Sequence, residues 1–241
     1  MTASPTARDE RTRLESIAEH STYGAGANAA TVAYSARVFG RLFRGERCLE
    51  LGPAEGLMTP YLAERFAHLT VVDGSARFCA DLRARFRHAR VVCSLFEDYA
   101  PEDRFDAIVL GHVLEHVEAP RALLARAREW LAPEGRLFAA VPNARSLHRQ
   151  AAVLMGLLGR EDELNEADLR HGHRRVYDPE SFRQDVQGAG LRIEVFGGYW
   201  LKPVSNGQIE RDWTPEMLEA FMALGERYPD IAGELYIVAT R

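Results

Sequence analysis

The stretch that decides the fold is Cys48-Leu49-Glu50-Leu51-Gly52-Pro53-Ala54-Glu55-Gly56. An apolar, strand-like run ends at an acidic residue, enters a turn with two glycines and leads into a helical pattern. Glycine lets a backbone approach a ligand closely, and the N-terminus of the following helix offers unpaired N–H groups. Taken alone, the loop fits a plain strand–helix connection as well as it fits a ligand-binding turn.

Asp73 makes this signal more specific. It follows the next apolar run, Leu69 to Val72, and lies 23 positions after Glu50. In nucleotide-binding strand–helix–strand units, an acidic residue at about 20 positions accepts hydrogen bonds from ribose hydroxyls. The alternative is an aspartate that caps the helix starting at Ser75, and the two roles are compatible.

Outward from this unit, short apolar runs alternate with helical segments, which predicts an α/β fold with a parallel, doubly wound sheet. The wholly apolar Ala107-Ile108-Val109-Leu110 suits a strand covered by helices on both faces. Strands are expected at 47–51, 69–72, 90–93, 106–110, 136–141, 191–196 and 234–240. Helices are expected at 8–20, 29–43, 58–67, 75–86, 121–131, 144–158, 178–188 and 214–227.

Composition narrows the class of protein. The 241 residues suffice for one sizeable core, and the net charge of -5 (30 Lys plus Arg against 35 Asp plus Glu) argues against a nucleic-acid partner. The three cysteines match no zinc pattern, the N-terminus lacks a signal-peptide pattern, and the longest apolar run, 151–159, is far below the ~20 residues that span a bilayer. We therefore expect a cytoplasmic protein with no membrane partner.

The ordered motifs resemble those of class I S-adenosylmethionine-dependent methyltransferases. They are Glu50-x-Gly52-x-Ala54-x-Gly56, Asp73, and Phe105-Asp106 leading to Leu114-Glu115-His116-Val117. The resemblance is strong over 45–141. It is weaker through Pro142-Asn143-Ala144-Arg145-Ser146-Leu147-His148 and Gly172-His173, which resemble a bacterial subgroup that often methylates small metabolites. One position departs from the family pattern, since Ala54 stands where the loop usually has its middle glycine.

The resemblance also implies an architecture. It predicts a Rossmann-like sheet of seven strands, the last one antiparallel, with an N-terminal helical lid over 1–43. The methyltransferase domain would then span 44–241, with substrate cover segments near 144–177 and 199–230.

S-adenosylmethionine is the cofactor that the resemblance implies. Glu50 would orient its methionine end through the amino group or a water, Asp73 would chelate the ribose diol, and Leu95 and Phe96 would flank the adenine. Phe96 is equally well explained as a core residue, and Tyr23 as a loop anchor instead of part of the lid. The residues expected to contact the cofactor are Tyr23, Glu50, Gly52, Pro53, Ala54, Gly56, Asp73, Gly74, Leu95, Phe96, Gly111 and His112.

His112 is the candidate catalytic base, because it follows the strand 106–110 at the edge of the sheet where open α/β folds place their ligands. The alternative is a histidine that packs against the cofactor without moving a proton, and His116 is commonly structural in this family. The locally basic segment Arg170 to Arg175 could accept an acidic metabolite, or it could be a solvated turn. No metal site is expected, since no convincing third ligand stands beside His171-x-His173. The residues expected to contact the acceptor are His116, His148, Arg170, His171 and His173.

The preferred prediction is a methyltransferase, a monomer or homodimer, acting on O or N of a small metabolite. An NAD(P)-dependent oxidoreductase would share the loop and the acid, but it would need a catalytic Tyr–Lys pair, and the single lysine is Lys202, in a late loop. A non-catalytic cofactor-binding module fits the loop equally well. Gly111-His112-Val113 stands where enzymes that methylate nucleic-acid amino groups carry an Asn-Pro-Pro-Tyr type of sequence, which again argues against a nucleic-acid base. A protein or tRNA substrate stays open as a variant.

Overall fold

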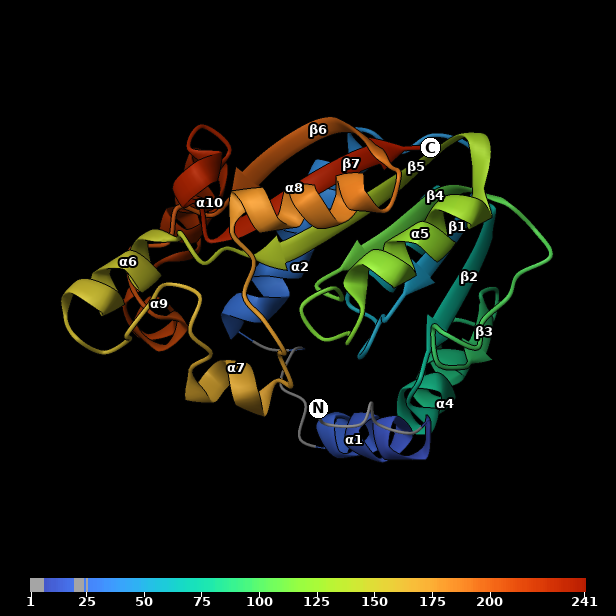
Figure 1. The fold of residues 1–241 in the computed structure, drawn as a ribbon, viewed down its shortest axis with the longest axis horizontal. Coiled ribbons are helices and arrows are strands. Elements are labelled where there is room, and N and C mark those ends of the chain that lie inside the picture. The colour runs from blue at the N-terminus through green and yellow to red at the C-terminus, as the bar shows by residue number, and fades with distance from the viewer. Residues whose placement is uncertain (1–6, 20–23, 25) are drawn as a thin grey trace.

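The chain folds around one seven-stranded sheet, and the computed structural model describes residues 7–19, 24 and 26–241. The strand order is β3-β2-β1-β4-β5-β7-β6, and β7 runs antiparallel to both of its neighbours while all the other pairs are parallel (Figure 1). The predicted α/β sheet, including its reversed last strand, is confirmed. The strands are β1 Arg47–Leu51, β2 His68–Asp73, β3 Arg90–Cys93, β4 Phe105–Gly111, β5 Leu131–Pro142, β6 Arg192–Tyr199 and β7 Glu234–Thr240.

Helices cover both faces of this sheet. Helices α5 and α8 cover one face and α2 the other (Figure 1), and Ile108 and Leu110 of β4 belong to the core on the first face, whereas Ala107 and Val109 belong to the core on the second. All four of these side chains are fully buried, so the prediction of a strand covered on both faces is confirmed. The described helices are α1 Ala7–Glu19, α2 Gly26–Gly40, α3 Thr59–Arg65, α4 Ala76–Arg85, α5 Pro120–Trp130, α6 Leu147–Leu154, α7 Glu166–Arg170, α8 Pro179–Gly188, α9 Asn206–Asp212 and α10 Pro215–Gly225, with a 3₁₀ turn at Pro229–Ile231.

The predicted helix caps at Asp178 and Thr214 are confirmed. Asp178 accepts a hydrogen bond from the Ser181 N–H (2.7 Å), and Thr214 accepts one from Met217 (3.3 Å). The helix expected over 144–158 is shorter, and α7 and α9 were not predicted. With five and seven residues, α7 and α9 are too short to show a helical period, and each begins instead at a capping box.

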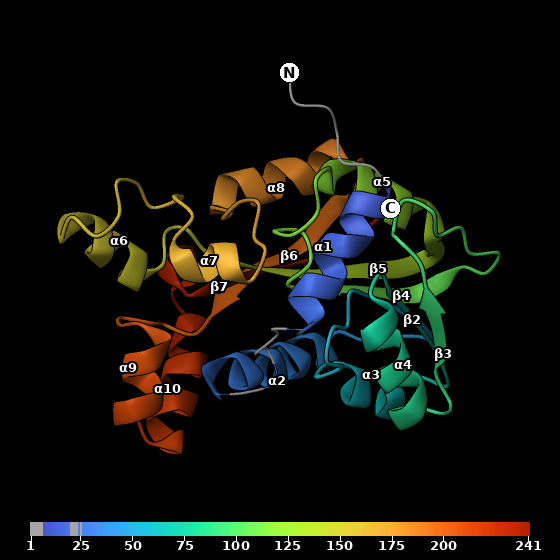
Figure 2. The same cartoon turned by 90° about the horizontal axis from the view of Figure 1, so that it is seen from below.

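One edge of the sheet gathers the positions that matter for function. The carboxyl ends of β1, β2 and β4 reach it, and so does the amino end of the antiparallel β7. Helix α1 lies along this edge between α4 and α7 (Figure 2). Within residues 7–19, 24 and 26–241, no helix has the length and apolar character needed to cross a bilayer.

Candidate functional site

A cavity of about 470 Å³ opens at this edge, within the range of about 300–1,000 Å³ typical of small-molecule sites. Its wall combines the loop after β1, the ends of β2 and β4, the start of β7, and the helices α1 and α2. Most of the residues predicted to hold a cofactor or acceptor line it. These are Glu50, Gly52, Pro53, Ala54, Asp73, Gly74, Leu95, Phe96, Gly111, His112, His116, His171 and His173. Tyr23 lies outside the described residues.

The loop after β1 is shaped by three left-handed positions at alternate residues. Gly52, Ala54 and Gly56 have φ values of +64°, +48° and +70°. Gly52 is also required by space, since a Cβ there would lie 2.9 Å from Val113. Gly56 is not among the described wall residues, and a Cβ on it would lie 2.7 Å from Leu82 in the core. Gly56 therefore shapes the turn instead of lining the cavity, which departs from its predicted cofactor contact.

Glu50 is a buried acid at the end of β1. Its side chain is 2% exposed, and its Oε2 accepts a hydrogen bond from the Thr59 hydroxyl at 2.8 Å. Burial raises the pKa of Glu50 to about 8, against the lowering effect of Thr59 and with an added rise from Asp73. A buried acid with so high a pKa is ready to take a cationic partner, because a nearby positive charge restores its ionised form.

Asp73 is fixed by the backbone at the end of β2. Its Oδ1 accepts from the Ser75 N–H (2.8 Å) and its Oδ2 from the Ala54 N–H (3.3 Å). Ser75 is the residue that caps α4, so the Asp73 carboxylate is not the side-chain cap of that helix. A carboxylate has about four acceptor positions, so both oxygens can still accept hydroxyl donors. Burial raises the pKa of Asp73 to about 6, and the backbone N–H groups offset part of this effect.

The next wall follows β3 and is largely apolar. Leu95 is buried, and Phe96 both lines the cavity and packs on the core, so its two predicted roles coexist. Helix α1 faces this wall closely, since a Cβ on Gly74 would lie 2.4 Å from Leu14. This half of the cavity therefore offers an apolar surface between the Asp73 carboxylate and α1.

His112 occupies the centre of the opposite half, directly after β4. Its backbone has φ +59°, a conformation that non-glycine residues rarely adopt outside functional or strained sites. Its Nδ1 lies 3.5 Å from Glu115 Oε1 and 3.7 Å from Glu234 Oε2, and its Nε2 lies 3.3 Å from the Tyr199 hydroxyl. Burial alone would lower the pKa of His112, but the two carboxylates raise it above its ordinary value. The surroundings can therefore stabilise a protonated imidazole.

His116 and His173 meet beside this centre. Their rings cross edge-to-face with centroids 4.8 Å apart, and the His171 ring lies 6.1 Å from His173. Burial lowers the pKa of His116 to about 4, and the neighbouring His173 lowers it further, against the raising effect of Glu115. His116 is therefore neutral near pH 7.

The basic segment predicted to accept an acidic substrate has another use. Arg174 donates to the His116 carbonyl (2.9 Å) and to Glu10 (2.8 Å), and Arg175 donates to the carbonyls of Leu114 (2.8 Å) and of Val117 and Glu118. The two arginines therefore fix the loop after β4 instead of facing the cavity.

Two predicted acceptor residues lie elsewhere. Arg170 is exposed, and His148 is half-buried next to Lys202, with its backbone N–H donating to the Lys202 carbonyl at 3.1 Å. Neither belongs to the described wall of the cavity. Burial lowers the pKa of His148 to about 2, with Lys202 adding to the effect.

Several wall residues had no place in the sequence predictions. Glu234 and Trp200 reach the cavity because β7 begins and β6 ends at this edge, and a reversed last strand is the signal that could have found Glu234. Glu15 of α1 is not among the described wall residues, but it accepts hydrogen bonds from the Ala76 N–H (2.5 Å) and the Ser75 hydroxyl (3.2 Å), next to Asp73. No local sequence pattern predicts this contact between Glu15 and the start of α4.

The cavity is negatively charged. Among the described wall residues, nine acids face one arginine, Arg13, which pairs with Glu10 at 2.8 Å. The nine are Glu10, Glu50, Glu55, Asp73, Glu97, Asp98, Glu115, Glu118 and Glu234. Such a wall favours cationic ligands over an acidic one.

A protein-family model described as "Methyltransferase domain" matches residues 25–194 of the chain. Among curated relatives, the ubiquinone biosynthesis O-methyltransferase of Aeromonas salmonicida is 27% identical over 175 residues, covering 69% of this chain and 71% of that protein. The enzyme of the same description from Xylella fastidiosa (strain 9a5c) is 28% identical over 172 residues, covering 67% of each.

Solved structures share the fold. The 1,6-didemethyltoxoflavin-N1-methyltransferase of Burkholderia thailandensis, with bound 1,6-didemethyltoxoflavin and S-adenosylhomocysteine, has a TM-score of 0.64 at 18% identity, covering all of this chain and 93% of that one. An S-adenosylmethionine-dependent methyltransferase from Mesorhizobium loti has a TM-score of 0.63 at 18% identity, covering 85% and 96%.

Proposed function

Because the chain belongs to the methyltransferase domain family, we propose that its cavity binds S-adenosylmethionine at the β1–β2 half and a small-molecule methyl acceptor at the β4–β7 half. This proposal rests on the division of one cavity into two chemically different halves. Glu50, Asp73 and the left-handed loop lie on one side, and His112 lies with two carboxylates and a tyrosine on the other.

The first half fits the cofactor. Glu50 would face the ammonium group of its methionine end, Asp73 would accept the ribose hydroxyls, and Leu95 and Phe96 would flank the adenine. The cofactor supplies an activated methyl group on a sulfonium, and its positive charges suit the acidic wall. Residues 7–19 of α1 would act as part of a lid over this half.

The second half supplies alignment and a base. Holding acceptor and methyl group in line contributes up to about 7–11 kcal/mol, and a general base typically contributes 10²–10⁴-fold. His112 would accept the proton of a hydroxyl or ammonium acceptor, and Glu115 and Glu234 would stabilise the imidazolium.

The acceptor is proposed as an uncharged or cationic small molecule methylated on O or N. The relatives named above include O-methyltransferases of ubiquinone biosynthesis and an N1-methyltransferase. Because Arg174 and Arg175 are used on the loop after β4, no group in the described wall of the cavity specifically favours an acidic acceptor.

Calorimetry with S-adenosylmethionine, for the wild type and Asp73→Asn, tests the cofactor half. We expect micromolar binding that weakens at least tenfold in the variant, followed by transfer of labelled methyl groups to members of a metabolite library. Binding of NAD(P) in place of S-adenosylmethionine would overturn the proposal.

A further inference from the structure

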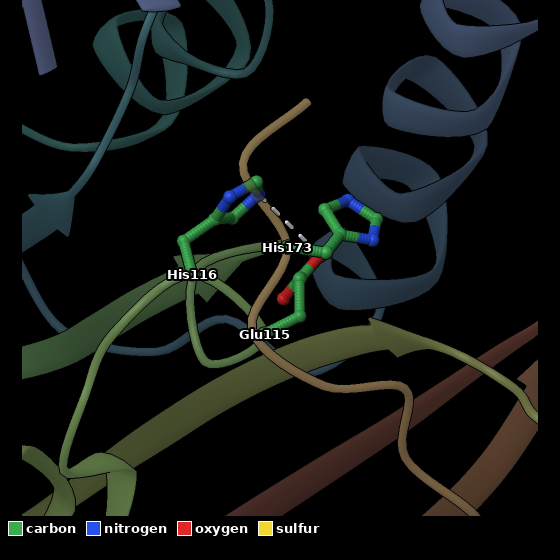
Figure 3. Close-up of side chains that lie close together, drawn as sticks. All are labelled: Glu115, His116 and His173. Atoms are coloured by element: carbon green, nitrogen blue, oxygen red, sulfur yellow. Dashed lines mark ion pairs between the residues drawn. The ribbon is translucent and has the colours of Figure 1, made fainter. Parts of the chain in front are cut away.

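Three side chains of the acceptor half converge on one point. Glu115, His116 and His173 each offer one ligand atom, and these atoms all lie within 4.8 Å of one another. Figure 3 shows the three side chains facing one another, with Glu115 and His116 from the loop after β4 and His173 from the segment after α7. The group thus joins two segments that lie far apart in sequence.

Glu115 is the member that most needs an explanation. Its side chain is 1% exposed, and within the described residues neither of its carboxylate oxygens accepts a hydrogen bond. The nearest nitrogens are His112 Nδ1 at 3.5 Å and His116 Nε2 at 3.9 Å, beyond good hydrogen-bond length. A buried carboxylate costs several kcal/mol unless a positive charge balances it, and either a protonated His112 or a bound metal ion would supply that charge.

The two histidines are already oriented by other groups. His173 Nδ1 lies 3.3 Å from Asp168 Oδ1, and Asp168 is held by Arg149 (3.1 Å) and by the Asn165 N–H (3.0 Å). The His116 ring is hydrogen-bonded to the backbone of Gly172. Histidines that bind metals usually have their second ring nitrogen next to a carboxylate or a carbonyl, and both of these histidines do.

We propose that Glu115, His116 and His173 bind a divalent transition-metal ion, with Zn²⁺ as the reference case, at the acceptor end of the cavity. Two imidazoles and one carboxylate are a donor set for Zn²⁺, Mn²⁺, Fe²⁺ or Co²⁺ more than for Mg²⁺ or Ca²⁺. Ligand atoms at about 2.0–2.2 Å from a tetrahedral metal are about 3.3–3.6 Å apart, so the side chains would close in by about 1 Å. The excess of acids in the wall offers charge compensation as well.

Three protein ligands leave at least one coordination position open. That position would be open to the cavity, because all three residues line it. This role rests on the proposed function: the open position would receive water or an oxygen of the methyl acceptor. The alternative is that a protonated His112 balances Glu115 and no metal is bound.

The test is metal binding to the full chain after treatment with a chelator. Co²⁺ is titrated and followed by its visible absorption, and Zn²⁺ is then added to displace it. We expect one equivalent per chain with micromolar or tighter affinity, and at least a tenfold loss in Glu115→Gln and in His173→Ala. His88→Ala removes an exposed histidine outside the proposed metal site and is the matched control. We expect its affinity for Co²⁺ to be that of the wild type.

S-adenosylmethionine binding and circular dichroism verify that each variant is folded, and keep this test separate from the proposed function. Failure to bind S-adenosylmethionine with metal binding intact would remove the proposed function and leave the metal site standing. A wild-type chain that binds no Co²⁺, or folded Glu115→Gln and His173→Ala chains that bind it as tightly as the wild type, overturns the metal site.

Discussion

The buried carboxyl of Glu50 makes cofactor binding depend on pH. Burial raises its pKa to about 8 in the free protein, so at pH 7.5 roughly three quarters of the molecules carry a proton there. If Glu50 faces the ammonium of S-adenosylmethionine, that proton must leave on binding. The affinity therefore falls as the pH falls, by up to tenfold per pH unit, or about 1.4 kcal/mol.

Between pH 7.5 and 5.5 this argument predicts a nearly hundredfold loss of affinity from Glu50. Asp73, with a pKa of about 6, adds roughly fourfold over the same range if it must be ionised to accept ribose hydroxyls. Calorimetry in two buffers of different ionisation enthalpy measures both the affinity and the proton released, expected at about 0.8 proton per cofactor at pH 7.5.

Glu50→Gln is the matched variant, because it keeps the size of the side chain and an acceptor for the Thr59 hydroxyl. Between pH 7.5 and 5.5, we expect the affinity of this variant for S-adenosylmethionine to change only by the roughly fourfold contribution of Asp73. Almost no proton should be released on binding at pH 7.5. A wild-type affinity that is the same within threefold at pH 5.5 and 7.5 would refute the assignment of Glu50 to the ammonium. A variant with the full wild-type slope would place the titrating group elsewhere.

The same carboxyl has a consequence for stability in the absence of cofactor. Because its folded pKa lies above its ordinary value of 4.5, the folded state binds more protons than the unfolded state between about pH 4.5 and 8. Stability of the wild type therefore falls with rising pH across this window, by at most about 4–5 kcal/mol from this group. Glu50→Gln should flatten that part of the profile in urea unfolding, and an unchanged profile would contradict the raised pKa.

Three further predictions concern the loop, the ribose site and the base. Ala54→Gly should leave the free energy of unfolding unchanged or raise it by up to about 1 kcal/mol, because φ is +48° at this position. Gly56→Ala should lower the free energy of unfolding by about 2 kcal/mol or more, because φ is +70° there and Leu82 is close. Urea unfolding measures both variants, and a larger loss for Ala54→Gly than for Gly56→Ala would refute the analysis of the turn. Asp73→Asn should weaken the binding of S-adenosylmethionine about 10–100-fold in calorimetry, while the melting temperature changes by only a few degrees. A large drop in melting temperature together with the loss of affinity would indicate a structural role for Asp73. His112→Gln should lower kcat about 10²–10⁴-fold on an acceptor found by the screen, with the cofactor affinity within threefold of wild type, and an unchanged kcat would exclude it as the base.

The sequence predicts the cofactor half of the site well, because that half is local in sequence. The loop after β1 and Asp73 belong to adjacent parallel strands, whose carboxyl ends must meet at one edge. The family, the enzyme class and the S-adenosylmethionine cofactor predicted from these motifs are confirmed by the match over residues 25–194, and the solved neighbours share the fold. The nicotinamide oxidoreductase alternative is thereby set aside, while the individual roles of the residues stay predictions.

The acceptor half is harder to predict because its contacts join distant segments. Glu234 reaches His112 only because β7 is reversed, and His173 reaches Glu115 only because Arg174 and Arg175 bind the carbonyls of the loop after β4. A run of arginines in sequence does not say whether its guanidinium groups face a substrate or the backbone. In the proposed metal site, His173 meets Glu115 and His116, which lie almost sixty positions away in the sequence, and His171 is not one of the ligands.

Helix α1 connects the two halves. Glu15 binds the start of α4 beside Asp73, while Arg13 donates to the Gly172 carbonyl (2.6 Å) and to the His116 carbonyl (3.4 Å) at the other end. The negative charge of Glu15 also helps to raise the pKa of Asp73, although burial is the larger cause. A ribose bound at Asp73, as proposed, would lie next to the Glu15 carboxylate. Helix α1 therefore contacts both the site proposed for the ribose and the loop that carries Glu115 and His116.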